Sequence, residues 1–255
     1  MRVRPSLLLV VTSLAAFCVA QTALGSTPAP EPAIAAANLQ RAAVVAPSVP
    51  VRPRRPRPHR LALVRSQLAV SDRPGGPATG SIGTTTEFGS PQVVGVAARR
   101  GAWLGVVTSA RPNGKLAWVR REPGALTLRR TRFSLHADLS RRTLTLRRDG
   151  RVVHRLRVAI GRPGSETPTG RFAVTDKLAG SSYGPYYGCC ILALSGHQPN
   201  TPPGWTGGNR LAIHGTDAPA TIGTPASAGC LRAADADLQT LMAKAPVGTP
   251  VFIHG

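Results

Sequence analysis

The sequence predicts a mainly β protein with a small β-barrel, followed by a larger β domain that carries one short helix. In residues 61–128, short apolar runs alternate with Gly, Pro and Asn turns, a pattern typical of small barrels. In residues 131–255, positions 143–146 alternate with period two and positions 148–151 carry a hairpin turn, which predicts a half-buried sheet. Asp235 is expected to cap the short helix that follows it.

The first 25 residues have the parts of a secretory signal peptide. Arg2 and Arg4 give a positive start, Leu7–Ala20 form an apolar run too short for a comfortable membrane span, and small residues permit cleavage before Ser26. We therefore expect an exported protein of the cell envelope, in the periplasm or the cell wall, or secreted. The alternative is an uncleaved signal sequence, which would be the chain's contact with a membrane.

Residues 26–60 are predicted to be a disordered linker rich in Pro, Ala and Arg. The linker ends in Val51–Arg60, where Pro and Arg alternate, and such a chain is extended and repels itself. Residues 131–255 hold 14 Lys and Arg against 7 Asp and Glu, so +14 of the net charge of +21 lies before residue 131. A basic segment seeks a polyanion. Outside the cytoplasm, anionic wall polymers or lipid head groups fit better than nucleic acid, which we do not expect; a solvated linker without a partner is an equal alternative.

The small barrel is expected over residues 61–128, with strands at Val93–Ala97, Trp103–Thr108 and Leu116–Arg120. Its run Gly-Ala-Trp-Leu-Gly-Val-Val, followed by Asn-Gly-Lys-Leu-Ala-Trp-Val-Arg, is similar to bacterial Src-homology-3-like wall-binding modules. The two tryptophans can form a ligand-stacking groove, but in so small a domain they more often form the core.

The larger domain is expected to continue with strands at Phe133–Asp138, Val152–Ile160, Arg171–Thr175 and Val251–Ile253. His154 is expected at the surface or in packing rather than in catalysis. Residues 176–209 are rich in Gly, Pro and aromatic side chains and are predicted to be one long ordered loop, a kind of segment that is usually functional.

The four cysteines are Cys18, Cys189, Cys190 and Cys230. Removal of the signal would leave three, an odd number that requires a free thiol, and Cys230 is the one we expect to be free. A disulfide between the adjacent Cys189 and Cys190 is possible but strained, so two packed or unpaired thiols are expected instead. No cysteine or histidine spacing matches a zinc site, so no metal is expected.

A thiol and an imidazole stand at the two ends of the stretch Leu211–Arg232. An apolar run ends directly before His214, and small residues flank Cys230, which follows sixteen positions later. The thiolate is the attacking species in acyl transfer, and a nearby imidazole can take its proton and later return it to a leaving amine. Gly229 lets the backbone approach a carbonyl, so the N–H groups of Gly229 and Cys230 are candidates for an oxyanion hole. For isolated residues, a buried thiol and a core histidine would be the simpler interpretation.

This stretch resembles the L,D-transpeptidase catalytic domain, also called the YkuD domain. The resemblance covers residues 131–255 and rests on four motifs. These are His-Gly-Thr from His214, Ser-x-Gly-Cys-x-Arg around Cys230, Thr167–Phe172 and Gly248–Val251. It implies a β-sandwich with a short helix. Many members of the family carry His where this chain has Ala228, a departure that leaves His214 in place.

The resemblance implies a role for each motif residue. Cys230 is the acylated nucleophile and His214 its base, oriented by the carbonyl of Gly215, while Thr216 and Ser227 support the loop by hydrogen bonds. The substrate is the stem peptide of peptidoglycan, linked from third residue to third residue without a cofactor, and a carbapenem should acylate the thiol.

Three further residues are expected to bind substrate. Arg232 can hold a substrate carboxylate with its planar fork of donors, although a structural pairing with Asp217 or Asp235 is equally simple. In the family, the segment that corresponds to the long loop caps the cleft, which makes Tyr186 and His197 candidates.

Two alternatives remain open. The same thioester can pass to water, giving an L,D-carboxypeptidase, or to a protein amine, giving attachment of a protein to the wall. A different class of function is a wall-binding protein with an inactive catalytic domain.

Overall fold

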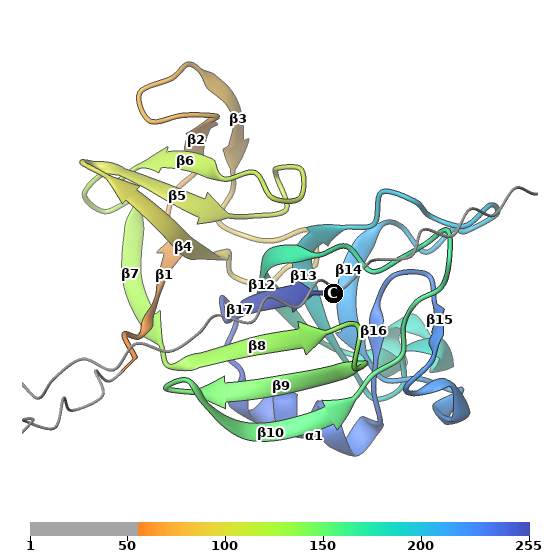
Figure 1. Cartoon of the computed structure of the whole chain (residues 1–255). Helices are drawn as coiled ribbons and strands as arrows, with labels where there is room; N and C mark the ends of the chain where they lie inside the picture. Colours follow the sequence, from red (N-terminus) through yellow and green to blue (C-terminus); the bar gives the residue numbers. More distant parts are fainter. Residues whose placement is uncertain (1–55) are drawn as a thin grey trace, which may run out of the picture. The chain divides into compact units, whose positions relative to one another are not determined.

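Two large β-sheets form the framework of residues 56–255, the part of the chain that the computed structural model describes (Figure 1). The mainly β fold class predicted from the sequence is therefore confirmed. The predicted signal peptide and nearly all of the predicted linker lie outside the described residues. Within residues 56–255, no helix is long and apolar enough to cross a membrane.

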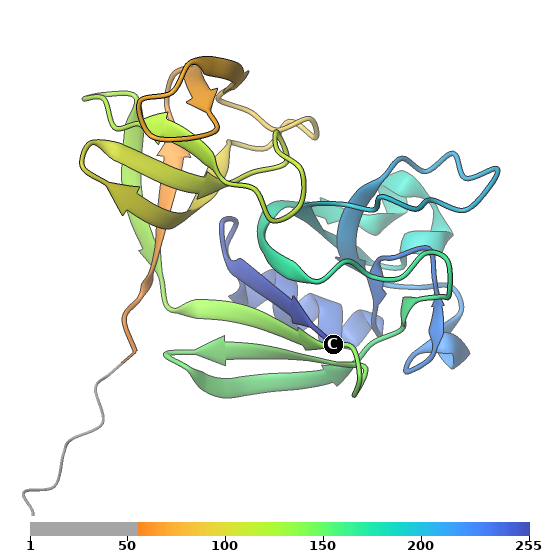
Figure 2. The same cartoon turned by 45° about the horizontal axis from the view of Figure 1, so that its top comes forward.

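The first sheet has seven strands in the order β3-β2-β6-β5-β4-β1-β7, each antiparallel to its neighbours. Their bounds are β1 His59–Val64, β2 Leu68–Ser71, β3 Ala78–Ile82, β4 Val93–Arg100, β5 Trp103–Val107, β6 Ala117–Arg120 and β7 Leu126–Thr131. Strands β1 (orange) and β7 (light green) run side by side in both views (Figure 1, Figure 2).

The interior of this sheet is a compact apolar cluster. It includes Ala62, Val70, Val106 and Val119, each almost fully buried, and Trp118 is 9% exposed, which agrees with a core position. The end strands β3 and β7 are not hydrogen bonded to each other, so the expected barrel is an open, curled sheet. Strand β7 instead passes almost directly into the second sheet, which begins at Phe133.

The second sheet has eight strands in the order β10-β9-β8-β17-β12-β13-β14-β16. Their bounds are β8 Phe133–Asp138, β9 Thr143–Arg148, β10 Arg151–Arg157, β12 Gly170–Ala179, β13 Cys190–His197, β14 Arg210–His214, β16 Leu231–Arg232 and β17 Pro250–His254. Residues from both ends of the sheet and from helix α1 (Asp235–Lys244) share one core, so the sheet closes over itself like a sandwich. A two-stranded parallel sheet pairs β11 (Ile160–Gly161) with β15 (Pro225–Ser227), which is part of the stretch Leu211–Arg232.

The predicted long loop over residues 176–209 is wrong for most of its length. Strand β12 continues to Ala179, two short 3-10 helices follow at Gly180–Tyr183 and Pro185–Tyr187, and β13 is a strand inside the sheet. Every residue of β13 except the last is buried, and a strand covered on both faces loses the alternation that reveals a half-exposed one. Only residues 198–209 remain as a loop beside the candidate site.

Asp235 does not cap helix α1 as predicted. The N-cap position is Ala234, and Asp235 is already the first helical residue. One oxygen of the Asp235 carboxylate accepts a hydrogen bond from the Cys189 amide at 3.1 Å. The Cys189 amide thus engages the carboxylate from a segment distant in sequence, a contact that the local sequence does not indicate.

Candidate active site

Parallel pairing of β14 with β16 brings together the two ends of the catalytic stretch. In this register Ile213 lies opposite Leu231, and His214 lies opposite Arg232. Leu211, Ile213 and Leu231 are almost fully buried, so the pairing is anchored by apolar packing on both strands. The chain between the strands loops out and returns through β15, which places Cys230 directly before β16.

A tight turn over Ser227–Cys230 presents the thiol. Gly229 has φ +119°, a backbone conformation that other residues rarely adopt. The Ser227 hydroxyl donates to the Cys230 carbonyl at 2.6 Å and accepts from the Gly229 amide at 3.0 Å. The Gly229 N–H is thus already engaged. Of the two predicted oxyanion donors, the Cys230 N–H is the one for which the described residues offer no hydrogen-bond partner.

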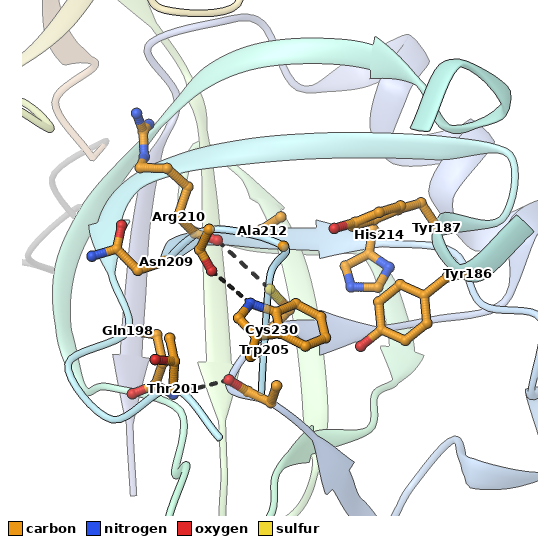
Figure 3. A pocket seen from close by; sticks show the side chains of 13 residues that line it. Tyr186, Tyr187, Gln198, Thr201, Trp205, Asn209, Arg210, Ala212, His214 and Cys230 are labelled. Carbon is orange, nitrogen blue, oxygen red and sulfur yellow. Dashed lines mark hydrogen bonds between the residues drawn. The ribbon is translucent and has the colours of Figure 1, made fainter. Parts of the chain in front are cut away.

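Cys230 and His214 line one small pocket (Figure 3). Its volume is about 40 Å³, which is room for a water molecule but not for a peptide. The imidazole packs against two tyrosine rings: its centroid is 4.9 Å from that of Tyr187 and 5.6 Å from that of Tyr186. The remaining lining residues come mainly from β14 and the 198–209 loop: Gln198, Thr201, Trp205, Gly207, Gly208, Asn209, Arg210, Ala212 and Ala228.

The imidazole of His214 is held in one tautomer. Its Nδ1 is 2.6 Å from the Gly215 carbonyl, which can only accept, so Nδ1 carries the proton and Nε2 carries the free lone pair. Nε2 is buried and has no hydrogen-bond partner among the described residues. Burial, together with a smaller effect of the positive charge of Arg232, lowers the pKa of His214 from 6.5 to about 4, against the opposing effect of the Gly215 bond. His214 is therefore a neutral base at physiological pH.

The thiol of Cys230 is protonated in the resting protein. Its Sγ lies 3.8 Å from the Arg210 carbonyl. Burial raises the pKa of the thiol, and the Ala212 amide and the charge of Arg232 lower it by less. The pocket therefore holds a neutral thiol and a neutral imidazole, rather than a preformed thiolate–imidazolium pair.

This resting state predicts the pH dependence of thiol alkylation. With iodoacetamide, the rate for Cys230 should rise steadily from pH 6 to beyond pH 9, because the thiolate fraction grows toward a raised pKa. A rate plateau below pH 7 would contradict the neutral pair. Mass spectrometry of the modified protein gives the rate, and Cys230→Ala identifies the modified residue.

Arg232 is a buried cation without a carboxylate partner. The residue is 7% exposed, its Nη2 donates to the hydroxyl of Tyr186, and its guanidinium carbon lies 4.5 Å from the centre of that ring. None of the ion pairs among residues 56–255 includes Arg232, so the expected alternative of pairing with Asp217 or Asp235 is not found. Its Nε has no partner in the described chain.

A second hollow of about 260 Å³ adjoins the pocket. Both are lined by Tyr186, Trp205 and Ala228, and the larger one adds Arg162 and Arg232. The two together form a cleft whose smaller part holds the thiol and whose larger part holds two guanidinium groups. Tyr186, for which the sequence suggests substrate binding, lines both hollows, and its role stays a prediction.

His197 and Thr216 lie outside the pocket lining. His197 is hydrogen bonded through Nδ1 to the Asn209 side chain at 3.1 Å and through Nε2 to the Ser109 carbonyl at 2.9 Å. Both ring nitrogens are thus engaged in holding loops. The Thr216 hydroxyl accepts from the Ala218 amide at 3.1 Å and shapes the turn after the catalytic histidine.

Gln198 is a site residue that the sequence did not reveal. It is buried, and its side-chain nitrogen lies within 3.2 Å of the carbonyls of Ser165, Glu166 and Ala228. It therefore ties the cysteine turn to a loop that is distant in sequence. No local signal distinguishes this glutamine, because its role arises only from tertiary contacts.

Cys189 and Cys190 form a disulfide, which corrects the expectation of two packed or unpaired thiols. The Cys190 carbonyl accepts from the Gly215 amide at 3.1 Å, so the pair lies directly behind the peptide that orients His214. Cys230 is the free cysteine of the described residues, as predicted.

A thiol count tests the disulfide. Within residues 56–255, denatured and unreduced protein should react with one equivalent of a thiol reagent, and with three after reduction. Three equivalents before reduction would show that Cys189 and Cys190 are free. A Cys18→Ser variant keeps the count unaffected by the N-terminal cysteine.

Residues 56–255 contain no group of three or more His, Cys, Asp or Glu side chains placed to hold a metal ion.

Comparison with known proteins shows similarity to one family over this region. Residues 132–253 match the YkuD family, the L,D-transpeptidase catalytic domain. The chain is 31% identical over 124 residues to the provisionally named L,D-transpeptidase YkuD of Bacillus subtilis (strain 168), covering 48% of this chain and 66% of the relative. The corresponding protein of Bacillus licheniformis is 30% identical over 123 residues, covering 48% and 65%. The matches thus span slightly less than two thirds of either relative.

Among solved structures, an L,D-transpeptidase from Mycobacterium smegmatis aligns with a TM-score of 0.41 and 16% identity, over 74% of this chain and 99% of that one.

Proposed function

We propose that this protein is an exported peptidoglycan L,D-transpeptidase that links the third-position diamino acids of two stem peptides through a thioester on Cys230. The observation that carries the proposal is one pocket lined both by a free thiol and by an imidazole whose Nδ1 is fixed by the Gly215 carbonyl and whose Nε2 is free to accept a proton. These groups lie within the region that matches the L,D-transpeptidase catalytic domain.

In the acylation step, the Cys230 sulfur attacks the carbonyl of the third residue of a tetrapeptide stem. Because the resting thiol and imidazole are both neutral, the proton moves from Sγ to Nε2 of His214 as the carbon–sulfur bond forms. The Cys230 N–H can donate to the developing oxyanion. Collapse breaks the peptide bond, and His214 returns the proton to the leaving amine of the terminal D-alanine.

The cleft offers a place for the rest of the donor stem. The free carboxylate of the diamino acid would meet Arg232, which is buried and lacks an acidic partner, with Arg162 in the same hollow. A guanidinium binds a carboxylate through paired hydrogen bonds. The smaller pocket of about 40 Å³ is too small for the stem, so the 198–209 loop, which carries Trp205, has to shift when substrate enters.

The second step decides which reaction the protein performs. Attack on the thioester by the side-chain amine of another stem regenerates the thiol and gives the cross-link. Attack by water gives a carboxypeptidase, and attack by a protein amine attaches that protein to the wall. The acylating residues are the same in all three reactions.

Mass spectrometry of the full chain incubated with disaccharide-tetrapeptide separates these outcomes. We expect dimers linked between third residues, and none with Cys230→Ala. Tripeptide without dimers would favour hydrolysis, and no change in the substrate would favour a wall-binding protein without catalysis. A carbapenem should add its mass to the reduced wild-type protein and not to Cys230→Ala.

A further inference from the structure

An arginine-lined groove crosses the first sheet. One hollow, of about 300 Å³, is lined by Arg60, Val96, Arg99, Leu104, Arg121, Leu128, Arg129 and Arg130. A second, of about 490 Å³, adjoins it and shares Arg99 and Arg121. Both lie on the sheet formed by residues 59–131, on elements that contribute nothing to the lining of the catalytic pocket.

The groove lies where the curled sheet is open. Strand β7 is an end strand, and its residues Leu128 and Arg130 share a sheet face with Ala62 and Arg60 of β1. Elsewhere on this face, the side chains of Ala62 and Val64 are buried in the core of the sheet. At the groove, in contrast, Leu128 is 47% exposed. The groove is therefore the uncovered end of the core, with an apolar floor and a rim of guanidinium groups.

Two of the arginines face each other directly. Arg60 and Arg130 are register partners of the antiparallel β1–β7 pair, and like charges at such positions destabilise a sheet. Strands usually place opposite charges or Thr at facing positions. A ligand with negative charge, bound in the hollow, would offset the repulsion between the Arg60 and Arg130 side chains. Such a ligand would explain why the two like charges face each other there.

The described residues do not supply that charge. None of the ion pairs among residues 56–255 includes Arg60, Arg99, Arg121, Arg129 or Arg130. Glu122 is the one acidic residue that lines either hollow. The five cations are all arginine rather than lysine, and the rigid fork of a guanidinium matches the oxygens of a phosphate group.

We propose that this arginine groove binds a linear phosphodiester polymer. Two adjoining hollows that share their arginines suit an extended chain better than a compact head group. A chain with a charge on every short repeat can meet all five cations, which a sparsely charged polysaccharide cannot. The Pro-Arg run of the sequence ends at Arg60, so further positive charge adjoins a groove residue in the sequence. The proposal is independent of the catalytic function.

The test uses the full chain, so the Pro-Arg run is present in every variant. The groove variant carries Arg60→Gln, Arg121→Gln and Arg130→Gln. The matched control carries Arg73→Gln, Arg151→Gln and Arg155→Gln, which removes the same charge from exposed positions outside the groove. The probe is poly(glycerol phosphate), with binding measured by titration at several salt concentrations.

We expect the groove variant to bind about tenfold or more weakly than wild type, and the dependence of log Kd on log salt to fall in slope by about two to three. The control should stay within about twofold of wild type. Because the groove variant relieves a like-charge pair, its melting temperature should not fall.

Three results would overturn the proposal. Equal weakening by the control would show that only net charge matters. Equally tight binding of a polycarboxylate such as poly-glutamate would remove the preference for phosphate. Tighter, Arg60-dependent binding to vesicles that contain phosphatidylglycerol would assign the groove to a membrane surface instead of a soluble polymer.

Discussion

Replacing His214 with Gln will lower the rate of acyl transfer at pH 7 by about a thousandfold, within the usual range for loss of a general base. The resting thiol has a raised pKa and is protonated, so the reaction depends on a base that removes its proton as the sulfur attacks. Glutamine can keep a hydrogen bond to the Gly215 carbonyl but cannot accept the proton. The rate is measured as cross-linked dimer formed from disaccharide-tetrapeptide.

The matched control for this variant is His154→Gln. His154 also is a partly buried histidine with a hydrogen bond, to Asp237 at 2.8 Å, but it lies outside the catalytic pocket. Its replacement should leave the rate within about twofold of wild type. If His214→Gln retained more than about a tenth of the wild-type rate, His214 would not be the base. Partial recovery of the variant at high pH, where the thiol ionises without help, would support the assignment.

Acidification from pH 7 to pH 4 will destabilise the folded protein by about 3 kcal/mol through His214 alone. Its pKa falls from 6.5 to about 4 on folding, so the unfolded chain binds the proton more readily. The contribution of His214 to the free energy of unfolding is fully present above pH 6.5 and is lost as the pH falls toward 4. His136 adds to the effect, because burial and the charges of Arg147, His254 and His59 lower its pKa to about 4. Its partial exposure makes its contribution smaller than that of His214.

Urea unfolding at pH 7, 5.5 and 4 measures this loss. The His214→Gln variant should show a clearly flatter dependence of unfolding free energy on pH, and His136→Gln should flatten it by less. A wild-type free energy of unfolding that stays constant between pH 7 and pH 4 would contradict a neutral, buried His214.

The sequence by itself was enough to select the residues to which we assign the chemistry of the candidate site. His214, Gly215 and the turn around Cys230 are recognisable because each needs a particular residue type: an imidazole at a strand end, a residue with φ near +119° before the thiol, and a hydroxyl at Ser227 that closes the turn. The mainly β class was also predictable, since alternation and turn residues act over a few positions. Such features depend on residues that are close together in the sequence, so a short stretch of sequence is enough to recognise them.

Only the tertiary structure decided which distant residues meet. Strand β13 carries no alternation because both of its faces are buried, and Gln198 acquires its role from carbonyls of loops some thirty residues away. The neutral state of the thiol–imidazole pair depends on how much water packing removes, which no motif encodes. The facing arginines of β1 and β7 likewise appear only when register is known, because a pairing between strands is set by the whole sheet and not by either strand alone.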